Sequence, residues 1–186
     1  MRLKIAIALT MAVAPVTAVS AAGLDTFYGV NAAACVPTGQ TSAQSMLFNS
    51  AADASFRAGG FGEIILTCPI PNTLARITKM TVRYRDDGVR GAGSQVVVAL
   101  RQKRYVFNGI STGVDAAPST ISEADTNAFV PPIVSPQGYR DFQKNVGPNN
   151  GTLTFDHRRF FYYLQINMRL PQGSSGPVSV GSITLF

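Results

Sequence analysis

The sequence contains no tryptophan, one histidine and two cysteines. A zinc-type site needs about four nitrogen, sulfur or oxygen ligands, and the cysteines form no Cys-x-x-Cys pair, so we expect neither a metal nor a cofactor. Basic residues are scattered without a block of like charge, so no nucleic-acid partner is expected. The absence of tryptophan weakens the case for stacking on sugars without excluding it.

Long apolar runs are also missing after the first twenty or so residues. The chain opens with Arg2 and Lys4 and continues as an apolar stretch over 5–19, with small residues up to Ala22. This layout is typical of a cleaved signal peptide. We predict a signal peptide over 1–22.

A membrane anchor is the alternative interpretation of this stretch. However, Pro15 interrupts it, and it is short for a hydrocarbon core of about 30 Å. No later segment approaches the roughly 18 apolar residues of a spanning helix. Loss of Arg2 and Lys4 lowers the formal charge from +6 to +4. We therefore expect 23–186 to be one secreted or periplasmic domain without a membrane span.

Both cysteines, Cys35 and Cys68, lie in this expected domain. An even count in an exported chain favours a disulfide bond, because secreted and periplasmic compartments are oxidising. Closing a loop of about 33 residues would stabilise the fold by roughly 3 to 4 kcal/mol on the chain-entropy model. Two buried free thiols are the alternative.

Apolar residues elsewhere recur mainly with a period of two, between prolines and glycines. This pattern is typical of half-buried strands, and helix signals are weak. A reversal of phase in the last run predicts a β-bulge near Gly181. Seven or eight such strands predict an all-β antiparallel sandwich of immunoglobulin-like or jelly-roll type, with a closed barrel as the alternative. The clearest runs are 62–68, 79–85, 95–101, 153–155, 160–170 and 178–185.

Between Asn108 and Lys144 the alternation disappears, and serine, threonine, alanine, proline and aspartate dominate. We interpret this part as a long connection with one short strand over 120–122. Long loops in compact domains often carry function.

A binding site needs aromatic or hydrogen-bonding side chains on one face or in loops. Two groups meet this condition, one in a basic stretch and one in the long connection. Their alternative roles are charge on an edge strand and anchoring of the loop, respectively. The candidate binding residues are Arg101, Arg104, Tyr105, Phe107, Tyr139 and Arg140.

A serine hydrolase would have to use His157 as its base. No Gly-x-Ser-x-Gly motif accompanies this histidine, which Asp156, Arg158 and Arg159 flank. For the paired carboxylates of a glycosidase the sequence offers two glutamates, Glu63 and Glu123, and eight aspartates that lie mostly in expected turns. We therefore predict no catalytic residue and a non-enzymatic protein.

Three short landmarks connect the chain to known sequences: Cys-Val-Pro at 35–37, Cys-Pro at 68–69, and Tyr-Tyr-Leu at 162–164 running to Leu-Pro at 170–171. In these landmarks the chain resembles a group of uncharacterised secreted bacterial proteins that are predicted to form small β-sandwiches. The resemblance implies export and a sandwich fold, and it implies no activity.

The last run ends at Leu185-Phe186, as the final strand of periplasmically assembled pilus subunits does. Such subunits exchange a terminal strand with a neighbour, and 25–34 could serve as that extension. Our first hypothesis is an exported, non-enzymatic module that binds a glycan or protein at a cell surface. A pilin-like fibre subunit is the second and a secreted hydrolase the third, and the oligomeric state stays open.

Overall fold

The computed structural model describes most of the chain after residue 26. The segment predicted to be a signal peptide, 1–22, lies outside the described residues. Within the described parts, no helix combines the length and the apolar character needed to cross a bilayer. These parts are residues 27–86, 93–107, 112–114, 117–128, 138–174 and 177–186.

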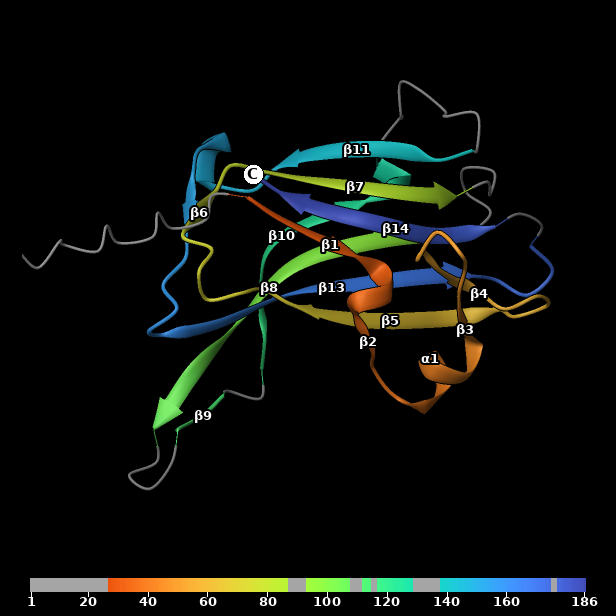
Figure 1. The fold of residues 1–186 in the computed structure, drawn as a ribbon, viewed down its shortest axis with the longest axis horizontal. Coiled ribbons are helices and arrows are strands. Elements are labelled where there is room, and N and C mark those ends of the chain that lie inside the picture. Colours follow the sequence, from red (N-terminus) through yellow and green to blue (C-terminus); the bar gives the residue numbers. More distant parts are fainter. Residues whose placement is uncertain (1–26, 87–92, 108–111, 115–116, 129–137, 175–176) are drawn as a thin grey trace, which may run out of the picture.

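The described strands form two six-stranded antiparallel sheets (Figure 1). The first sheet has the order β11-β7-β14-β4-β3, and β1 also pairs with β14. Its strands are β1 (Tyr28–Asn31), β3 (Met46–Phe48), β4 (Ala54–Phe56), β7 (Lys79–Asp86), β11 (Arg140–Asn145) and β14 (Val178–Leu185).

The second sheet has the order β10-β8-β13-β5-β2, and β9 pairs with the far end of β8. That end of β8 runs past the other strands and projects from the sandwich together with β9 (Figure 1). The strands are β2 (Val36–Pro37), β5 (Gly62–Pro69), β8 (Gln95–Phe107), β9 (Thr112–Val114), β10 (Ser119–Asp125) and β13 (Phe160–Leu170). The other described elements are β6 (Arg76–Ile77), which pairs with β12 (Leu153–Thr154), the helix α1 (Gln40–Ser45), and the 3-10 helices η1 (Ala32–Ala34), η2 (Thr126–Ala128) and η3 (Pro148–Asn150).

The order of the main strands identifies the sandwich as a jelly roll. Along the chain, β4, β7, β11 and β14 enter the first sheet, and β5, β8, β10 and β13 enter the second. Strands from distant parts of the chain are thereby interleaved in each sheet, as in two interlocked Greek keys. The all-β antiparallel sandwich predicted from the sequence is confirmed. Of the immunoglobulin-like and jelly-roll types that the sequence left open, the strand order matches the jelly roll.

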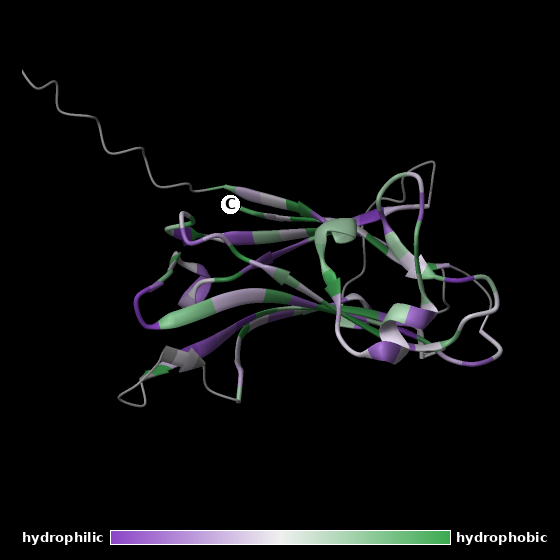
Figure 2. Ribbon diagram, turned by 60° about the horizontal axis from the view of Figure 1, so that its bottom comes forward, coloured by the Kyte–Doolittle hydropathy of each residue, from purple (hydrophilic) through white to green (hydrophobic). Residues whose placement is uncertain are grey.

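The period-two pattern places one face of each main strand in the core. In β13, Tyr162, Leu164 and Ile166 are buried, whereas the alternate residues Gln165 and Asn167 are half-buried. Figure 2 shows the two layers of strands, with hydrophobic and hydrophilic residues alternating along them. The outward faces of the sheets can therefore carry side chains that the core does not use.

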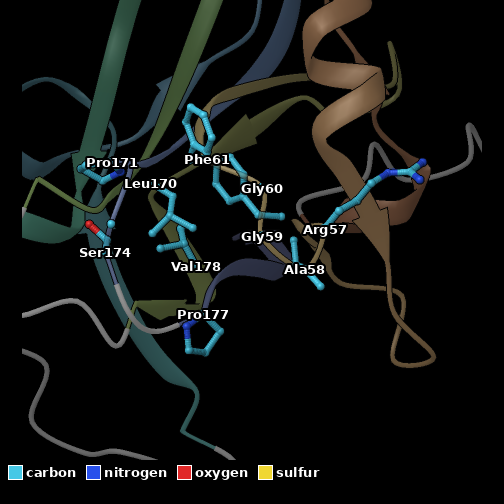
Figure 3. A pocket seen from close by; sticks show the side chains of 13 residues that line it. Arg57, Ala58, Gly59, Gly60, Phe61, Leu170, Pro171, Ser174, Pro177 and Val178 are labelled. Carbon is cyan, nitrogen blue, oxygen red and sulfur yellow. The ribbon is translucent and has the colours of Figure 1, made fainter.

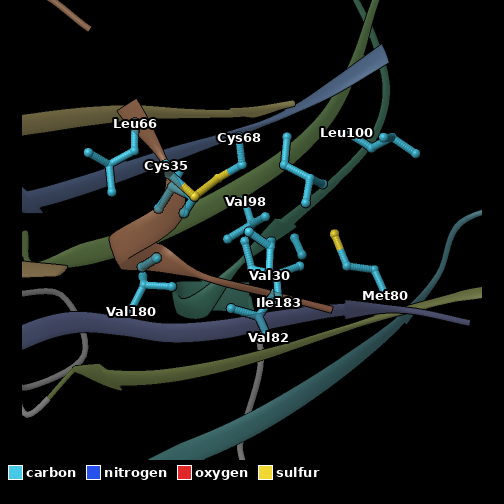
Figure 4. Packing of buried hydrophobic residues seen from close by; sticks show 14 of the residues in the cluster. Val30, Cys35, Leu66, Cys68, Met80, Val82, Val98, Leu100, Val180 and Ile183 are labelled. Carbon is cyan, nitrogen blue, oxygen red and sulfur yellow. A yellow bond between two sulfur atoms is a disulfide. The ribbon is translucent and has the colours of Figure 1, made fainter. Parts of the chain in front are cut away.

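Cys35 and Cys68 form the predicted disulfide bond, with an S–S distance of 2.05 Å. Cys68 belongs to β5 of the second sheet, whereas Cys35 follows η1, which continues from β1 of the first sheet. Both are buried in the same apolar cluster as Leu66 and Val98 (Figure 4). The bond therefore fastens the N-terminal segment to the second sheet at the point where the segment leaves the first.

The predicted bulge in the last strand is also present. The register of β14 against β7 shifts between Val180 and Ser182, which leaves Gly181 as the extra residue. A Cβ atom at Gly181 would lie 2.7 Å from Oδ1 of Asp53. The bulge thus makes room for a buried carboxylate beside the strand.

The short strand predicted over 120–122 is part of β10, but the long connection predicted around it is wrong, because β9 and β11 also lie in this part of the chain. Residues 129–137 of it lie outside the described parts. Along β11 only Phe142 is buried, because this edge strand pairs with β7 alone and most of its side chains face water. A strand with one buried side chain does not show the period-two pattern.

β1 pairs with β14 of the same chain, from Tyr28 opposite Leu185 to Asn31 opposite Ser182. The described part of the segment that we considered as a strand for a neighbouring subunit is therefore occupied within its own sheet. The fibre-subunit hypothesis stays a prediction, to be tested by the oligomeric state of the purified protein.

Candidate ligand-binding site

The outward face of the second sheet carries a hollow of about 380 Å³. Small-molecule sites occupy about 300 to 1,000 Å³, so this hollow has the size of a ligand site. Strands β8, β13 and β5 form its floor, and residues next to β10 and β2 form its two sides. We term it the cross-strand hollow; its lining residues are Pro118, Arg101, Lys103, Phe161, Tyr163, Gln165, Thr67 and Thr38.

Strand pairing brings these side chains together. Tyr163 of β13 lies opposite Arg101 of β8. On the other side of β13, Gln165 lies opposite Thr67 of β5. Facing residues in antiparallel strands have Cβ atoms about 4.5 to 5.5 Å apart. The lining therefore forms one continuous surface, set by the register of three neighbouring strands.

Phe161 and Tyr163 form an aromatic pair on the floor of the hollow. Their ring centroids are 5.8 Å apart and their planes differ by 24°. Tyr163 is only 7% exposed and supports the half-buried Phe161, which offers more of its ring to a ligand. Burial raises the pKa of the Tyr163 hydroxyl, although the Arg101 guanidinium opposes this shift. The hydroxyl therefore stays protonated at neutral pH and can donate a hydrogen bond.

Two hydroxyls and one amide complete the polar lining. The Oγ1 atoms of Thr38 and Thr67 are 3.0 Å apart, so one hydroxyl donates to the other. One hydroxyl proton and several oxygen lone pairs of this pair are left for a ligand. The amide of Gln165 adds both a donor and an acceptor. The hollow can thus fix the orientation of a polar ligand.

Arg101 is one of the candidate residues from the sequence, and it lines the hollow. Tyr105 lies four residues further along β8, so alternation places it on the same outward face but beyond the lining. Arg104 alternates to the opposite face and is exposed. Phe107 is the last residue of β8, and its side chain lies outside the described residues.

Tyr139 and Arg140 lie at the start of β11 in the first sheet, so the fold does not bring them to the cross-strand hollow. The Tyr139 hydroxyl donates to the carboxylate of Asp53, which also accepts from Nδ2 of Asn49 at 3.0 Å. The guanidinium carbon of Arg83 lies 5.1 Å from the centre of the Tyr139 ring. Burial, and next the bond to Asp53, raise the pKa of Tyr139. These contacts hold the start of β11.

Several lining residues were not among the candidates from the sequence. Phe161, Tyr163 and Gln165 alternate with the buried residues of their strand, so two adjacent outward positions are aromatic. That pattern is visible in the sequence and could have identified them. Thr38 and Thr67 carry no such signal, because they meet only when β2 pairs with β5.

His157 has the contacts of a packing residue. Its Nε2 atom lies 2.8 Å from the carbonyl oxygen of Leu74. Because a carbonyl only accepts, Nε2 carries the proton. The ring stacks on Phe155 with centroids 5.5 Å apart and meets Tyr162 edge to face. In the part of the chain that the structure describes, no group of three or more His, Cys, Asp or Glu side chains could hold a metal ion.

A second hollow, of about 440 Å³, lies between the turn 57–61 and the segments that end β13 and begin β14 (Figure 3). Its lining consists mainly of glycine, proline and apolar side chains. The Arg57 side chain extends away from it, and its Nε donates to the carbonyl of Met46 at 2.8 Å (Figure 3). This hollow offers few side-chain groups to orient a ligand, so we place the candidate site in the cross-strand hollow.

No family model and no curated protein matches the chain. Among solved structures it is similar to a family two carbohydrate esterase from Cellvibrio japonicus, with 12% identity, a TM-score of 0.36 and coverage of 86% of this chain and 33% of that one. It is also similar to the isomalto-dextranase of Arthrobacter globiformis T6 in complex with panose, with 14% identity, a TM-score of 0.40 and coverage of 86% and 23%. The chain thus spans a minor part of each protein. Likeness at these TM-scores carries no conclusion about this chain.

Proposed function

We propose that the protein is an exported, non-enzymatic binding module that holds a glycan in the cross-strand hollow. One observation carries this proposal: a stacked pair of aromatic rings shares a concave face with hydroxyl, amide and cationic side chains. A sugar ring has C–H groups that pack against an aromatic face and hydroxyls that need hydrogen-bonding partners at its edge. The hollow offers both kinds of contact.

The shape of the site favours a glycan over a protein as the surface partner. Stable protein–protein interfaces bury about 800 Å² on each partner. The cross-strand hollow is a local depression of about 380 Å³, which matches a small ligand or one unit of a chain.

Export to the cell surface or periplasm is part of the same proposal. The Cys35–Cys68 disulfide fits an oxidising compartment, where such bonds persist. The basic and apolar start of the sequence has the layout of a signal peptide.

A glycan panel tests the proposal on the exported protein and on the double variant Tyr163→Phe/Gln165→Ala. The double substitution removes a hydroxyl and an amide but leaves the aromatic pair in place. Two lost hydrogen bonds of about 1 kcal/mol each should weaken binding by roughly tenfold or more. Gln143→Ala is the matched control, because Gln143 is an exposed residue of β11 in the other sheet. The proposal fails if no glycan binds, or if the double variant and the control bind equally well.

A further inference from the structure

We infer that the ligand of the cross-strand hollow is an acidic glycan, whose carboxylate or sulfate groups bind Arg101 and Lys103. This inference rests on the proposed function and adds the charge of the ligand. Arg101 and Lys103 are alternate residues of β8, opposite Tyr163 and Phe161. Both cations therefore lie on the outward face, directly beside the aromatic pair.

The positive charge in the hollow is not neutralised by its own lining. Of the eight lining residues, two are cations and none is acidic. Neither Arg101 nor Lys103 forms an ion pair with a described residue. The Nε atom of Arg101 is buried and has no hydrogen-bond partner among those residues. An anionic group on a ligand in the hollow would give the guanidinium a charged acceptor, which its protein surroundings do not provide among the described residues.

Carboxylates near the hollow form no ion pair with these two cations among the described residues. Glu63, at the start of β5, accepts a hydrogen bond from Asn167. Asp125, at the end of β10, accepts from Nε2 of Gln95 at 2.8 Å. Glu123 lies opposite Ala99 and does not line the hollow. Glu123 is exposed and lies one outward position along the sheet from Arg101, so Lys103 is the cation that lies farther from the acidic groups.

Further cations lie near the end of β8 and the start of β13, although Arg104 faces the side of the sheet opposite the hollow. Arg104 is exposed and lies opposite Phe160. The adjacent turn carries exposed Arg158 and Arg159, and the carbonyl of Arg159 accepts from the backbone N–H of Tyr105 at 2.9 Å. Among the described residues, only Arg159 in this group has an acidic partner, the exposed Asp156 at 4.0 Å.

The neutral groups of the hollow favour a glycan over other polyanions. A free phosphate or a simple anion has no apolar face that could pack on the Phe161–Tyr163 pair, and it does not require the Gln165 amide. A uronic acid or a sulfated sugar combines C–H faces, hydroxyls and a negative group in one unit.

Titration calorimetry on the exported protein tests the inference with hexagalacturonate, a heparin-derived hexasaccharide and neutral cellohexaose as probes. One of the two acidic probes should bind at least about tenfold more tightly than cellohexaose, and the affinity should fall as salt is added. Which acidic probe binds distinguishes a carboxylate from a sulfate ligand. Lys103→Gln and Arg101→Gln should each weaken acidic binding about tenfold, because each removes a charged hydrogen-bond donor. The control Lys79→Gln removes the same charge from an exposed position on β7 and should change nothing.

Two results would overturn the inference in different ways. If cellohexaose binds as tightly as the acidic probes, and only Tyr163→Phe/Gln165→Ala weakens it, the ligand is neutral and the proposed function stands. If no oligosaccharide binds, the proposed function fails as well. Equal binding of an oligothymidylate through Arg101 and Lys103 would show general polyanion binding and overturn the acidic-glycan assignment. Thermal melting of each variant confirms that it is folded. If Arg101→Gln does not fold, Lys103→Gln alone provides the test.

Discussion

Asp53 is a buried carboxylate that the described structure surrounds with hydrogen-bond donors. Its side chain accepts from Asn49 at 3.0 Å and from the Tyr139 hydroxyl, and its backbone N–H donates to Oδ1 of Asn49 at 3.0 Å. A buried charge without such donors would be costly. Tyr139, a candidate binding residue in the sequence, therefore has the contacts of an anchor between the start of β11 and the segment before β4.

Replacing Tyr139 by Phe should lower the free energy of unfolding by about 1 to 3 kcal/mol, because buried Asp53 loses a donor. Urea unfolding at neutral pH measures this loss. Tyr105→Phe is the matched control, since none of the described residues bonds its hydroxyl, and it should stay within about 0.5 kcal/mol of wild type. Equal stability of the two variants would contradict the anchoring role.

The Tyr139–Asp53 hydrogen bond should also make the stability difference between wild type and Tyr139→Phe depend on pH in the alkaline range. The pKa of Tyr139 is raised from its ordinary value of 10.0, so the folded state favours the protonated hydroxyl. Below about pH 10 the hydroxyl is protonated in both states and its contribution is fully present. As the pH rises through the folded pKa this contribution is lost. The advantage of wild type over Tyr139→Phe should therefore decline as the pH rises into the alkaline range.

At the scale of elements, the sequence predicts strands well where both neighbours are strands. β7, β8, β13 and β14 each pair on two sides and bury one face, which imposes the period-two pattern on their residues. β11 is an edge strand with only Phe142 buried, and β3 and β4 are three residues long. Neither an edge strand nor so short a strand contains enough buried positions to show a period.

The candidate site could be predicted in part, because some of its residues lie on strands with a clear period-two pattern. Arg101 was found because basic and aromatic residues cluster in β8, and Phe161 and Tyr163 could have been found from their alternation in β13. Their joint position required the pairing of β13 with β8. Thr38 enters the hollow only through the pairing of β2 with β5, which no local pattern encodes.

The bulge in β14 supports a prediction about this strand. Gly181→Ala should destabilise the protein by about 1 to 3 kcal/mol, because its Cβ would lie 2.7 Å from Oδ1 of Asp53. Asn49 and Tyr139 donate to Oδ2 of the same carboxylate and limit how far it can move away. Gly29→Ala in the adjacent strand β1 is the control, since its Cβ would meet only the Phe27 ring at 3.9 Å. Urea unfolding should leave the control within about 0.5 kcal/mol of wild type. If both variants unfold at the same urea concentration, the bulge does not serve to accommodate Asp53.

For the whole molecule, one side of the cross-strand hollow depends on how the N-terminal segment crosses between the sheets. β1 lies in the first sheet and β2 at the edge of the second, and Cys35 stands between them. The disulfide to Cys68 fixes that crossing to β5. Thr38, which follows β2, then reaches Thr67 of β5 and closes one side of the cross-strand hollow.

Removing the disulfide should therefore lower the stability of the protein strongly. It should also disturb the side of the cross-strand hollow that Thr38 closes. In Cys35→Ala/Cys68→Ala, the free energy of unfolding should fall by about 3 kcal/mol, because a loop of 33 residues is no longer closed in the unfolded chain. Urea unfolding of the double variant, compared with wild type under reducing and non-reducing conditions, measures this loss. A reductant should lower the stability of wild type to that of the double variant and leave the double variant unchanged. An unchanged wild-type midpoint under full reduction, verified by thiol titration, would show that hydrogen bonding of β1 and β2 alone holds the crossing.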